Sequence, residues 1–144
     1  MERMNSGMEL TGKTILVVDD QAPIRALIRQ ALEPKGAVIL EAADGYQALD
    51  TVEQHAGAIT LAIVDFLMPG ISGLDLAVQL AGDLPALKIL YISSAIESIA
   101  MESLHRRSPE SVLLKPFTVP ELLLRVHTLC EEPSPPREGG VIGQ

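Results

Sequence analysis

Short, nearly continuous apolar runs alternate along the chain with segments whose apolar residues recur at helical spacing. The runs are rich in β-branched residues, which is typical of strands buried on both faces of a parallel sheet. We expect five such strands, at residues 14–18, 37–40, 61–64, 88–92 and 112–114. The pattern therefore predicts a parallel sheet whose two faces are both covered.

The segments between these runs have the periodicity of amphipathic helices. A final helix is expected to begin at Thr118, because a Thr N-cap and Glu121 three residues later can satisfy each other's free backbone donors. The expected apolar faces are Ile24, Leu27, Ile28 and Leu32; Leu74, Ala77, Val78 and Leu80; Ile96, Ile99, Ala100 and Leu104; and Leu122, Leu123, Val126, Leu129 and Cys130. Five strands alternating with five helices predict a doubly wound α/β domain with helices on both sheet faces.

The two ends of the chain differ in composition from the middle. Residues 1–12 lack a periodic pattern, and residues 131–144 are rich in Pro and Gly without periodicity. We expect both ends to be disordered, the second as a tail or the stub of a linker. The folded unit is therefore predicted to span residues 13–130 as one domain.

Composition and charge narrow the classes of ligand. The 144 residues carry a formal net charge of −8, four aromatic residues and no Trp, and no basic arm is present. This composition argues against nucleic acid as a direct ligand, since recognition of nucleic acid relies on cationic and stacking side chains. No apolar run approaches the roughly 18 residues needed to span a bilayer, and residues 1–10 lack the apolar core of a signal peptide. We expect a cytoplasmic chain without a membrane partner.

Cys130 is the single cysteine of the chain. One cysteine excludes an intrachain disulfide framework and any metal site built from a cysteine cluster. We interpret Cys130 as a buried apolar residue near a helix end.

Polar side chains follow four of the five predicted strands. The first strand ends in Asp19 and Asp20, the third in Asp65, the fourth in Ser93 and the fifth in Lys115. In doubly wound folds, ligands bind beyond the carboxyl ends of the strands, so these groups are candidates for one site. Converging carboxylates repel one another unless a cation neutralises them, and Mg²⁺ suits a site of carboxylates, waters and a phosphoryl oxygen. Carboxylate, cation, ammonium and hydroxyl together suit phosphoryl transfer to an oxygen nucleophile.

Four motifs in this order make the sequence similar to the receiver domains of two-component response regulators. The resemblance covers Lys13 to about Cys130, and its motifs are Ile15-Leu-Val-Val-Asp-Asp20, Val64-Asp65-Phe66-Leu67-Met68-Pro69 with Gly73, Leu90-Tyr-Ile-Ser93 and Leu114-Lys115-Pro116-Phe117. The resemblance implies a CheY-like, flavodoxin-like fold with strand order 2-1-3-4-5 and five helices. It also implies a cis peptide bond between Lys115 and Pro116.

The resemblance assigns a role to each residue of the site. Asp65 would accept the phosphoryl group, Ser93 would hydrogen-bond that group and Lys115 would be its counter-ion. Mg²⁺ would be bound by Asp65, directly by Asp20, mostly through water by Asp19, and by the backbone carbonyl of Leu67. The implied function is a phosphorelay receiver that takes its phosphoryl group from a sensor histidine kinase or a histidine phosphotransfer protein. It would then signal to a downstream protein effector, and a homodimer is compatible with this function.

Three positions depart from the family pattern. Receivers often carry a rotating switch aromatic three residues before the Lys, where this chain has Val112. Ser72 replaces a frequent Asp, and residues 109–111 replace the usual Gly-Ala before the last strand. We therefore expect any coupling from Ser93 to use the loop after the fourth strand or smaller side-chain shifts.

Three alternative functions have specific weaknesses. Residues 7–14 match the literal P-loop pattern, but a P-loop follows a strand and opens a helix, whereas here a strand follows. An aspartyl-phosphate phosphatase would need a carboxylate two residues after its Asp nucleophile, where Leu67 cannot transfer protons. A docking module that is never phosphorylated would not need the complete site of Asp19, Asp20, Asp65, Ser93 and Lys115.

Overall fold

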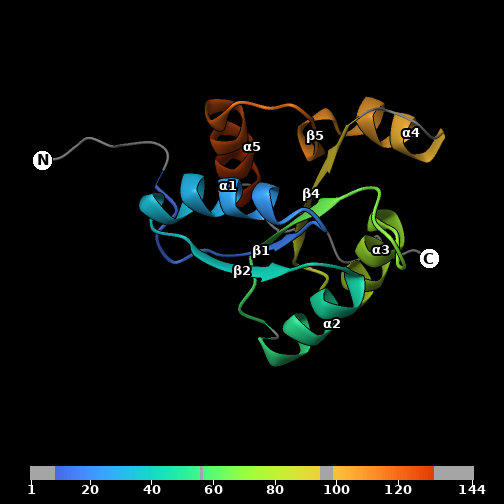
Figure 1. The fold of residues 1–144 in the computed structure, drawn as a ribbon, viewed down its shortest axis with the longest axis horizontal. Helices are drawn as coiled ribbons and strands as arrows, with labels where there is room; N and C mark the ends of the chain where they lie inside the picture. Colours follow the sequence, from blue (N-terminus) through green and yellow to red (C-terminus); the bar gives the residue numbers. More distant parts are fainter. Residues whose placement is uncertain (1–8, 56, 95–98, 132–144) are drawn as a thin grey trace, which may run out of the picture.

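The protein forms a three-layer α/β/α domain built on one five-stranded sheet (Figure 1). A computed structural model describes residues 9–55, 57–94 and 99–131. The strands are β1 (Thr14–Val18), β2 (Val38–Ala42), β3 (Leu61–Asp65), β4 (Lys88–Ser93) and β5 (Val112–Leu114). The helices are α1 (Ala22–Leu32), α2 (Gly45–Gln54), α3 (Gly73–Asp83), α4 (Ile99–Arg107) and α5 (Val119–Glu131), with 3-10 turns η2 (Glu33–Lys35) and η3 (Pro109–Ser111).

All pairs of neighbouring strands are parallel, and the strand order is β2-β1-β3-β4-β5. This order and the alternation with five helices confirm the predicted fold class. The predicted second strand is displaced, since β2 begins at Val38 and extends to Ala42. The strand order reverses direction next to β1, where β1 lies between β2 and β3. Ligands in such folds bind at this reversal, beyond the carboxyl ends of the strands.

Alternate residues of the central strands belong to two separate hydrophobic clusters, one on each face of the sheet. This arrangement explains why these strands are apolar throughout. In β1, Ile15 and Val17 contact the cluster under α1 and α5, whereas Leu16 and Val18 contact the cluster under α2 and α3. Successive side chains of a strand point to opposite faces, so a strand covered on both sides has no polar position. The side chain of Cys130 is buried in the first cluster, as expected.

Two residues that spacing placed on apolar helix faces lie on the outside. Leu27 is 37% exposed and Val78 is 66% exposed, while Ala31 and Leu76 occupy inward positions of α1 and α3. Consecutive residues of a helix point about 100° apart, and the inward arc of each helix includes Ile28 but not Leu27, and Ala77 but not Val78. Spacing alone did not determine which residue of each pair turns inward.

The face of α4 also differs from the prediction. Met101, which was absent from the predicted set, is fully buried in a third hydrophobic cluster, and Leu104 packs against that cluster. This third cluster also contains Phe66, Tyr91 and Val112. Ile96, a member of the predicted set, lies outside the described residues.

The packed part of the domain extends beyond the expected start at Lys13. Leu10 is fully buried in the cluster under α1 and α5. Its backbone N–H donates to the carbonyl of Lys35 over 2.8 Å, and its own carbonyl accepts from the N–H of Lys13. Leu10 therefore belongs to the core, which moves the start of the packed chain before Lys13.

The predicted capping box at the start of α5 is present. The N–H of Thr118 donates to Glu121 Oε1 over 2.8 Å, and the N–H of Glu121 donates to Thr118 Oγ1 over 3.2 Å. These two bonds satisfy backbone donors that a helix start leaves free.

Within the described ranges, no helix combines the length and apolar character needed to cross a membrane.

Candidate functional site

The sheet order brings the polar ends of four strands to one edge. Asp19 and Asp20 follow β1, Asp65 ends β3, Ser93 ends β4 and Lys115 follows β5. Because β1, β3, β4 and β5 are successive neighbours, parallel pairing places these ends side by side. The structure therefore assembles all five residues that the sequence suggested at the expected edge.

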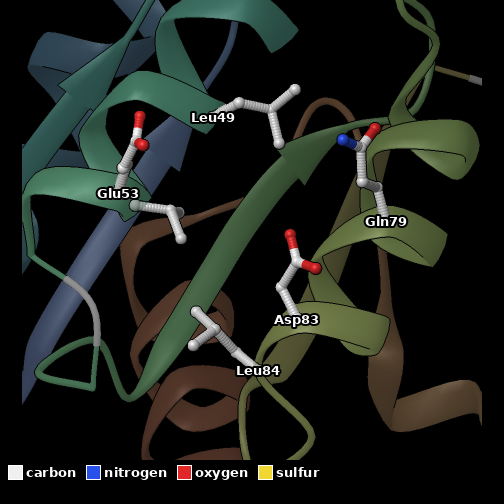
Figure 2. A pocket seen from close by; sticks show the side chains of 6 residues that line it. Leu49, Glu53, Gln79, Asp83 and Leu84 are labelled. Carbon is white, nitrogen blue, oxygen red and sulfur yellow. The ribbon is translucent and has the colours of Figure 1, made fainter.

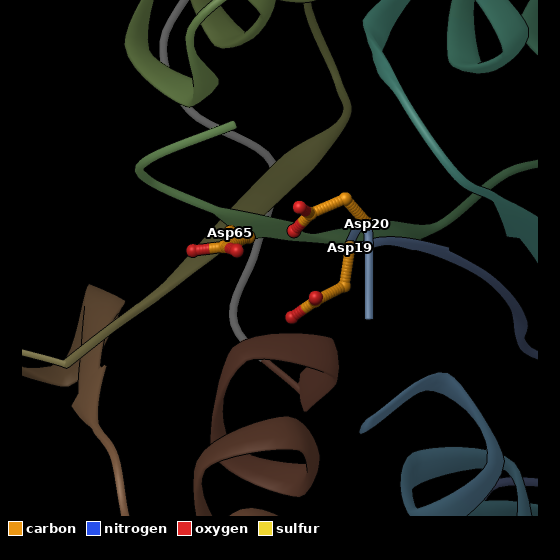
Figure 3. Close-up of side chains that lie close together, drawn as sticks. All are labelled: Asp19, Asp20 and Asp65. Atoms are coloured by element: carbon orange, nitrogen blue, oxygen red, sulfur yellow. The ribbon is translucent and has the colours of Figure 1, made fainter. Parts of the chain in front are cut away.

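Three carboxylates converge at the centre of this edge (Figure 3). One oxygen atom from each of Asp19, Asp20 and Asp65 lies within 4.8 Å of the other two. The side chains of Asp19 and Asp65 are buried, whereas Asp20 is exposed. Such a cluster is unfavourable without a positive charge, because burial removes the water that would screen it.

Lys115 supplies a positive charge on one side of the cluster. Its Nζ atom lies 3.3 Å from Asp19 Oδ2 and 3.7 Å from Asp65 Oδ2. The same ammonium donates to Gln21 Oε1 over 3.3 Å. One monovalent ammonium cannot neutralise three carboxylates, so the donor set retains net negative charge.

Backbone and neighbouring groups orient the carboxylates. The N–H of Leu67 donates to Asp65 Oδ1 over 3.3 Å, and the N–H of Gln21 donates to Asp19 Oδ1 over 2.8 Å. The guanidinium of Arg25 donates to the backbone carbonyl of Asp19 over 2.7 Å. Sequence reasoning missed Gln21 and Arg25, since polar residues near a helix start are common and carry no distinguishing motif.

The environment raises the pKa of Asp65 from 3.8 to about 6. Burial is the largest cause, and the charge of Asp19 adds to it. Lys115 and the N–H of Leu67 oppose this rise, and Asp20 makes a smaller contribution that raises the pKa. A cation bound beside Asp65 would therefore lower this pKa and favour the charged carboxylate.

The backbone at the start of α3 lies very close to the backbone at the end of β3. A Cβ atom on Gly73 would lie 2.2 Å from the carbonyl oxygen of Asp65 and 2.7 Å from Cα of Phe66. The N–H of Gly73 donates to the carbonyl of Phe66 over 3.0 Å. Only glycine fits where α3 begins so close to the end of β3, which explains the Gly in this motif.

Ser93 and Lys115 are positioned by strand pairing. Ser93 pairs with Leu114, and the N–H of Lys115 donates to the carbonyl of Ser93 over 2.7 Å. The side chain of Ser93 is 1% exposed. The peptide bond between Lys115 and Pro116 is cis, which confirms the expectation from the resemblance.

Val112 occupies the position where receivers often carry a switch aromatic, as the sequence shows. Val112 is buried against Phe66, Tyr91 and Met101. The rings of Phe66 and Tyr91 meet edge to face, with centroids 6.1 Å apart at 70°. An aromatic ring is therefore present behind the site, but it comes from β4, two residues before Ser93.

The donor set fits a hard divalent cation. Three carboxylates that approach within 4.8 Å offer only oxygen ligands, and one of them is exposed to water. Mg²⁺ prefers such ligands and keeps several waters when it binds. Lys115 lies beside the cluster, where it can pair with a further anion.

The sequence of this chain matches a known protein family. The family model for the response regulator receiver domain matches residues 15–127. The response regulator RppA of Synechocystis is 34% identical over 80% of this chain and 49% of its own length. The sensor kinase CckA of Brucella abortus is 27% identical over 91% of this chain and 14% of its own length. This chain therefore spans half or less of the length of these relatives.

A solved structure agrees with the family match. The receiver domain of the hybrid histidine kinase CckA is 32% identical and superposes with a TM-score of 0.67. The match covers 82% of this chain and 99% of that domain. With the family match over most of its length, this chain belongs to the response regulator receiver domains of two-component systems.

Proposed function

We propose that this receiver domain accepts a phosphoryl group on Asp65 in a Mg²⁺-dependent reaction. The observation that carries the proposal is the proximity of the Asp65 carboxylate to two further carboxylates and to the ammonium of Lys115. The donor is a phosphohistidine of a sensor histidine kinase or a histidine phosphotransfer protein. The phosphorus–nitrogen bond of the donor breaks as a bond forms between phosphorus and an Asp65 oxygen, and the imidazole keeps the electron pair and takes up a proton.

Each neighbouring group has a part in this reaction. Asp20 and Asp65, with the backbone carbonyl of Leu67, would hold Mg²⁺ directly, and Asp19 mostly through water. The bound metal supplies positive charge that offsets the negative charge of the carboxylates and the phosphoryl oxygens. Lys115 would pair with a phosphoryl oxygen, and the hydroxyl of Ser93 would donate to another.

A pocket beside the site supports docking of the donor protein. It has a volume of about 310 Å³, and its described lining residues are Ile24, Leu27, Ser94, Lys115, Pro116 and Phe117. Apart from Ser94 and Lys115 these side chains are apolar, and Leu27 is 37% exposed. A donor that packs on this apolar surface would bring its phosphohistidine next to Lys115, at the mouth of the site.

The acidic charge of the chain favours output through protein contact. The net charge is −8, which opposes direct binding to a nucleic-acid backbone. The signal would pass from the hydroxyl of Ser93 through β4 to Tyr91, whose ring packs with Phe66 and Val112. The downstream effector is therefore proposed to be a protein.

The test is phosphorylation by a small donor. Wild-type protein is incubated with acetyl phosphate and Mg²⁺, and intact-mass spectrometry should show one added phosphoryl group. Asp65→Asn should remove this adduct, because an amide oxygen is not the required nucleophile. Asp50→Asn is the matched control, because Asp50 is an exposed carboxylate on α2.

The same experiment separates the alternatives. Equal labelling of Asp65→Asn and wild type would reject Asp65 as the acceptor. No labelling of wild type by acetyl phosphate or by a phosphohistidine donor would favour a docking module without phosphorylation. Continuous release of phosphate from a small phosphate monoester would instead indicate a phosphatase. Ser93→Ala should still be labelled, but its amide chemical shifts should respond less, since the hydroxyl that contacts the phosphoryl group is missing.

A further inference from the structure

Most of the net negative charge of the chain falls in one continuous part of the sequence, because that part lacks basic residues. Residues 36–87 contain seven Asp and Glu residues and no Lys or Arg. This part includes α2 and α3 (Figure 1), which share one face of the sheet with α4. By contrast α1, α4 and α5 each contain arginine. Among the five helices, α2 and α3 are therefore the two that carry acidic residues and no arginine or lysine.

A groove lies between these two acidic helices, α2 and α3. Its volume is about 340 Å³, and Leu49, Val52 and Leu84 are its apolar lining. Glu53, Gln79 and Asp83 are its polar lining. Figure 2 shows Leu49 and Glu53 on one side of the groove and Gln79, Asp83 and Leu84 on the other.

The two carboxylates of the groove lack a positive partner within the described part of the chain. Glu53 and Asp83 are exposed, and the ion pairs found among the described residues involve other side chains. Two negative charges that flank one groove leave its potential negative, which favours a cation there.

The ends of the helices add to this negative potential. α2 ends at Gln54 and α3 ends at Asp83, so the groove lies beside the last turns of both helices. The carboxyl end of a helix carries partial negative charge from its free carbonyl groups, and basic residues in the last turn usually offset it. Neither helix has a basic residue in its last turn. Carboxylates and helix ends therefore independently favour a positive ligand.

We propose that this groove is a docking site for a protein partner that presents a basic, amphipathic segment. The aliphatic stem of a partner Arg or Lys would pack on Leu49, Val52 and Leu84. Its charged end would lie between Glu53 and Asp83. The acidic surface repels nucleic acids and anionic membranes, so the charge of the groove selects a basic polypeptide.

The groove is separate from the phosphoacceptor site. Each helix of this fold runs antiparallel to the strand before it, so the last turns of α2 and α3 lie toward the amino ends of the strands. Asp65 lies at the carboxyl end of β3. Loss of docking would therefore leave phosphorylation of Asp65 intact, and failure of either proposal is distinguishable from failure of the other.

The test measures binding of a defined basic probe. A fluorescein-labelled amphipathic helical peptide of leucine and arginine is titrated with the full chain, and fluorescence anisotropy gives its affinity. Glu53→Gln with Asp83→Asn should weaken binding roughly fivefold, because two exposed ion pairs each contribute modestly. Amide chemical shifts of the wild type should change mainly along α2 and α3. Phosphorylation of the double variant by acetyl phosphate reports that it is folded.

A charge-matched variant separates docking from general attraction. Glu102→Gln with Glu131→Gln removes two exposed charges from α4 and α5, outside the groove. This control should bind the peptide within about twofold of wild type. Equal weakening in both double variants, or shifts spread over the whole surface, would overturn the proposal. So would a wild-type chain that sediments as a dimer and becomes monomeric when Glu53 and Asp83 are replaced, because a second copy would then be the occupant.

Discussion

The ammonium of Lys115 lies 3.7 Å from the carboxylate of Asp65, although the two residues lie at the ends of strands that are not neighbours in the sheet. Lys115 begins the loop after β5, and Asp65 ends β3, with β4 between them. The long Lys side chain bridges this gap and opposes the effect of burial on the pKa of Asp65. This contact makes the charge state of Asp65 dependent on a residue of another element.

Removal of the Lys115 ammonium should raise the pKa of Asp65 further above its value of about 6. Lys115 lowers this pKa, while burial and Asp19 raise it. Lys115→Met keeps a similar side-chain length without the charge, and Lys115→Arg keeps the charge as a control. Carboxyl ¹³C chemical shifts, followed against pH without metal, measure the pKa. An unchanged pKa in Lys115→Met would contradict the electrostatic role of Lys115.

Replacement of Asp65 by Asn should stabilise the metal-free protein at neutral pH. As pH rises, the carboxyl loses its proton near 3.8 in the unfolded chain but only near about 6 in the folded chain. The folded state therefore binds more protons between these values, so the free energy of unfolding falls as pH rises through them. Above pH 6 the penalty is fully present, and Asp65→Asn removes about 1–3 kcal/mol of it.

Denaturant unfolding at several pH values checks this prediction. The difference in the free energy of unfolding between Asp65→Asn and wild type should be largest above pH 6 and should vanish below pH 3.8. Asp50→Asn, on the exposed side of α2, should show no such dependence. A difference that is independent of pH would exclude titration of Asp65 as its cause.

Mg²⁺ should stabilise the wild-type protein at pH 7.5, and a chelator should reverse the effect. A ligand that binds only the folded state stabilises it by about 1–2 kcal/mol when its concentration is ten to thirty times its Kd. The three carboxylates of the cluster are the proposed source of this binding. Thermal unfolding with Mg²⁺ should show a smaller rise in Tm for Asp20→Asn than for wild type. The same rise in both would argue against Asp20 as a ligand.

Gly73→Ala should destabilise the domain strongly, while Gly82→Ala in the same helix should not. A Cβ atom on Gly73 would lie 2.2 Å from the carbonyl oxygen of Asp65, and this backbone atom cannot move aside cheaply. We expect a loss of about 3 kcal/mol or more. A Cβ atom on Gly82 would have no neighbour within 4 Å, so Ala there should add about 0.5–1 kcal/mol through helix propensity. Urea unfolding of both variants measures the difference.

Leu67→Asn should shorten the lifetime of the phosphorylated protein, a prediction that rests on the proposed function. Leu67 lies two residues after Asp65, and its apolar side chain is 51% exposed at the mouth of the site. An apolar group there would shield the acyl phosphate from attacking water, whereas Asn would help to orient that water. Decay of the phosphorylated form, followed by intact mass, gives the half-life. Equal half-lives would reject shielding by Leu67.

Local sequence patterns predicted the order of strands and helices well, because the spacing of apolar residues reflects which side chains are buried. A strand covered on both sides must be apolar throughout, as in residues 14–18, and a capping box announces a helix start at Thr118. The same reasoning failed for Leu27 and Val78, which are exposed, and for Leu10, which is buried. Leu10 is held by a backbone hydrogen bond to Lys35, which is distant in sequence, and helical spacing alone does not mark the edge of an inward face.

The amino-acid sequence by itself determined the strand and helix order and placed Asp19, Asp20, Asp65, Ser93 and Lys115 at strand ends. Only the tertiary structure decided the distances among them, the raised pKa of Asp65 and the contacts of Gln21 and Arg25. The groove between α2 and α3 likewise exists only after the helices pack. Chain order fixes which groups can meet, but burial and electrostatic coupling depend on neighbours in space.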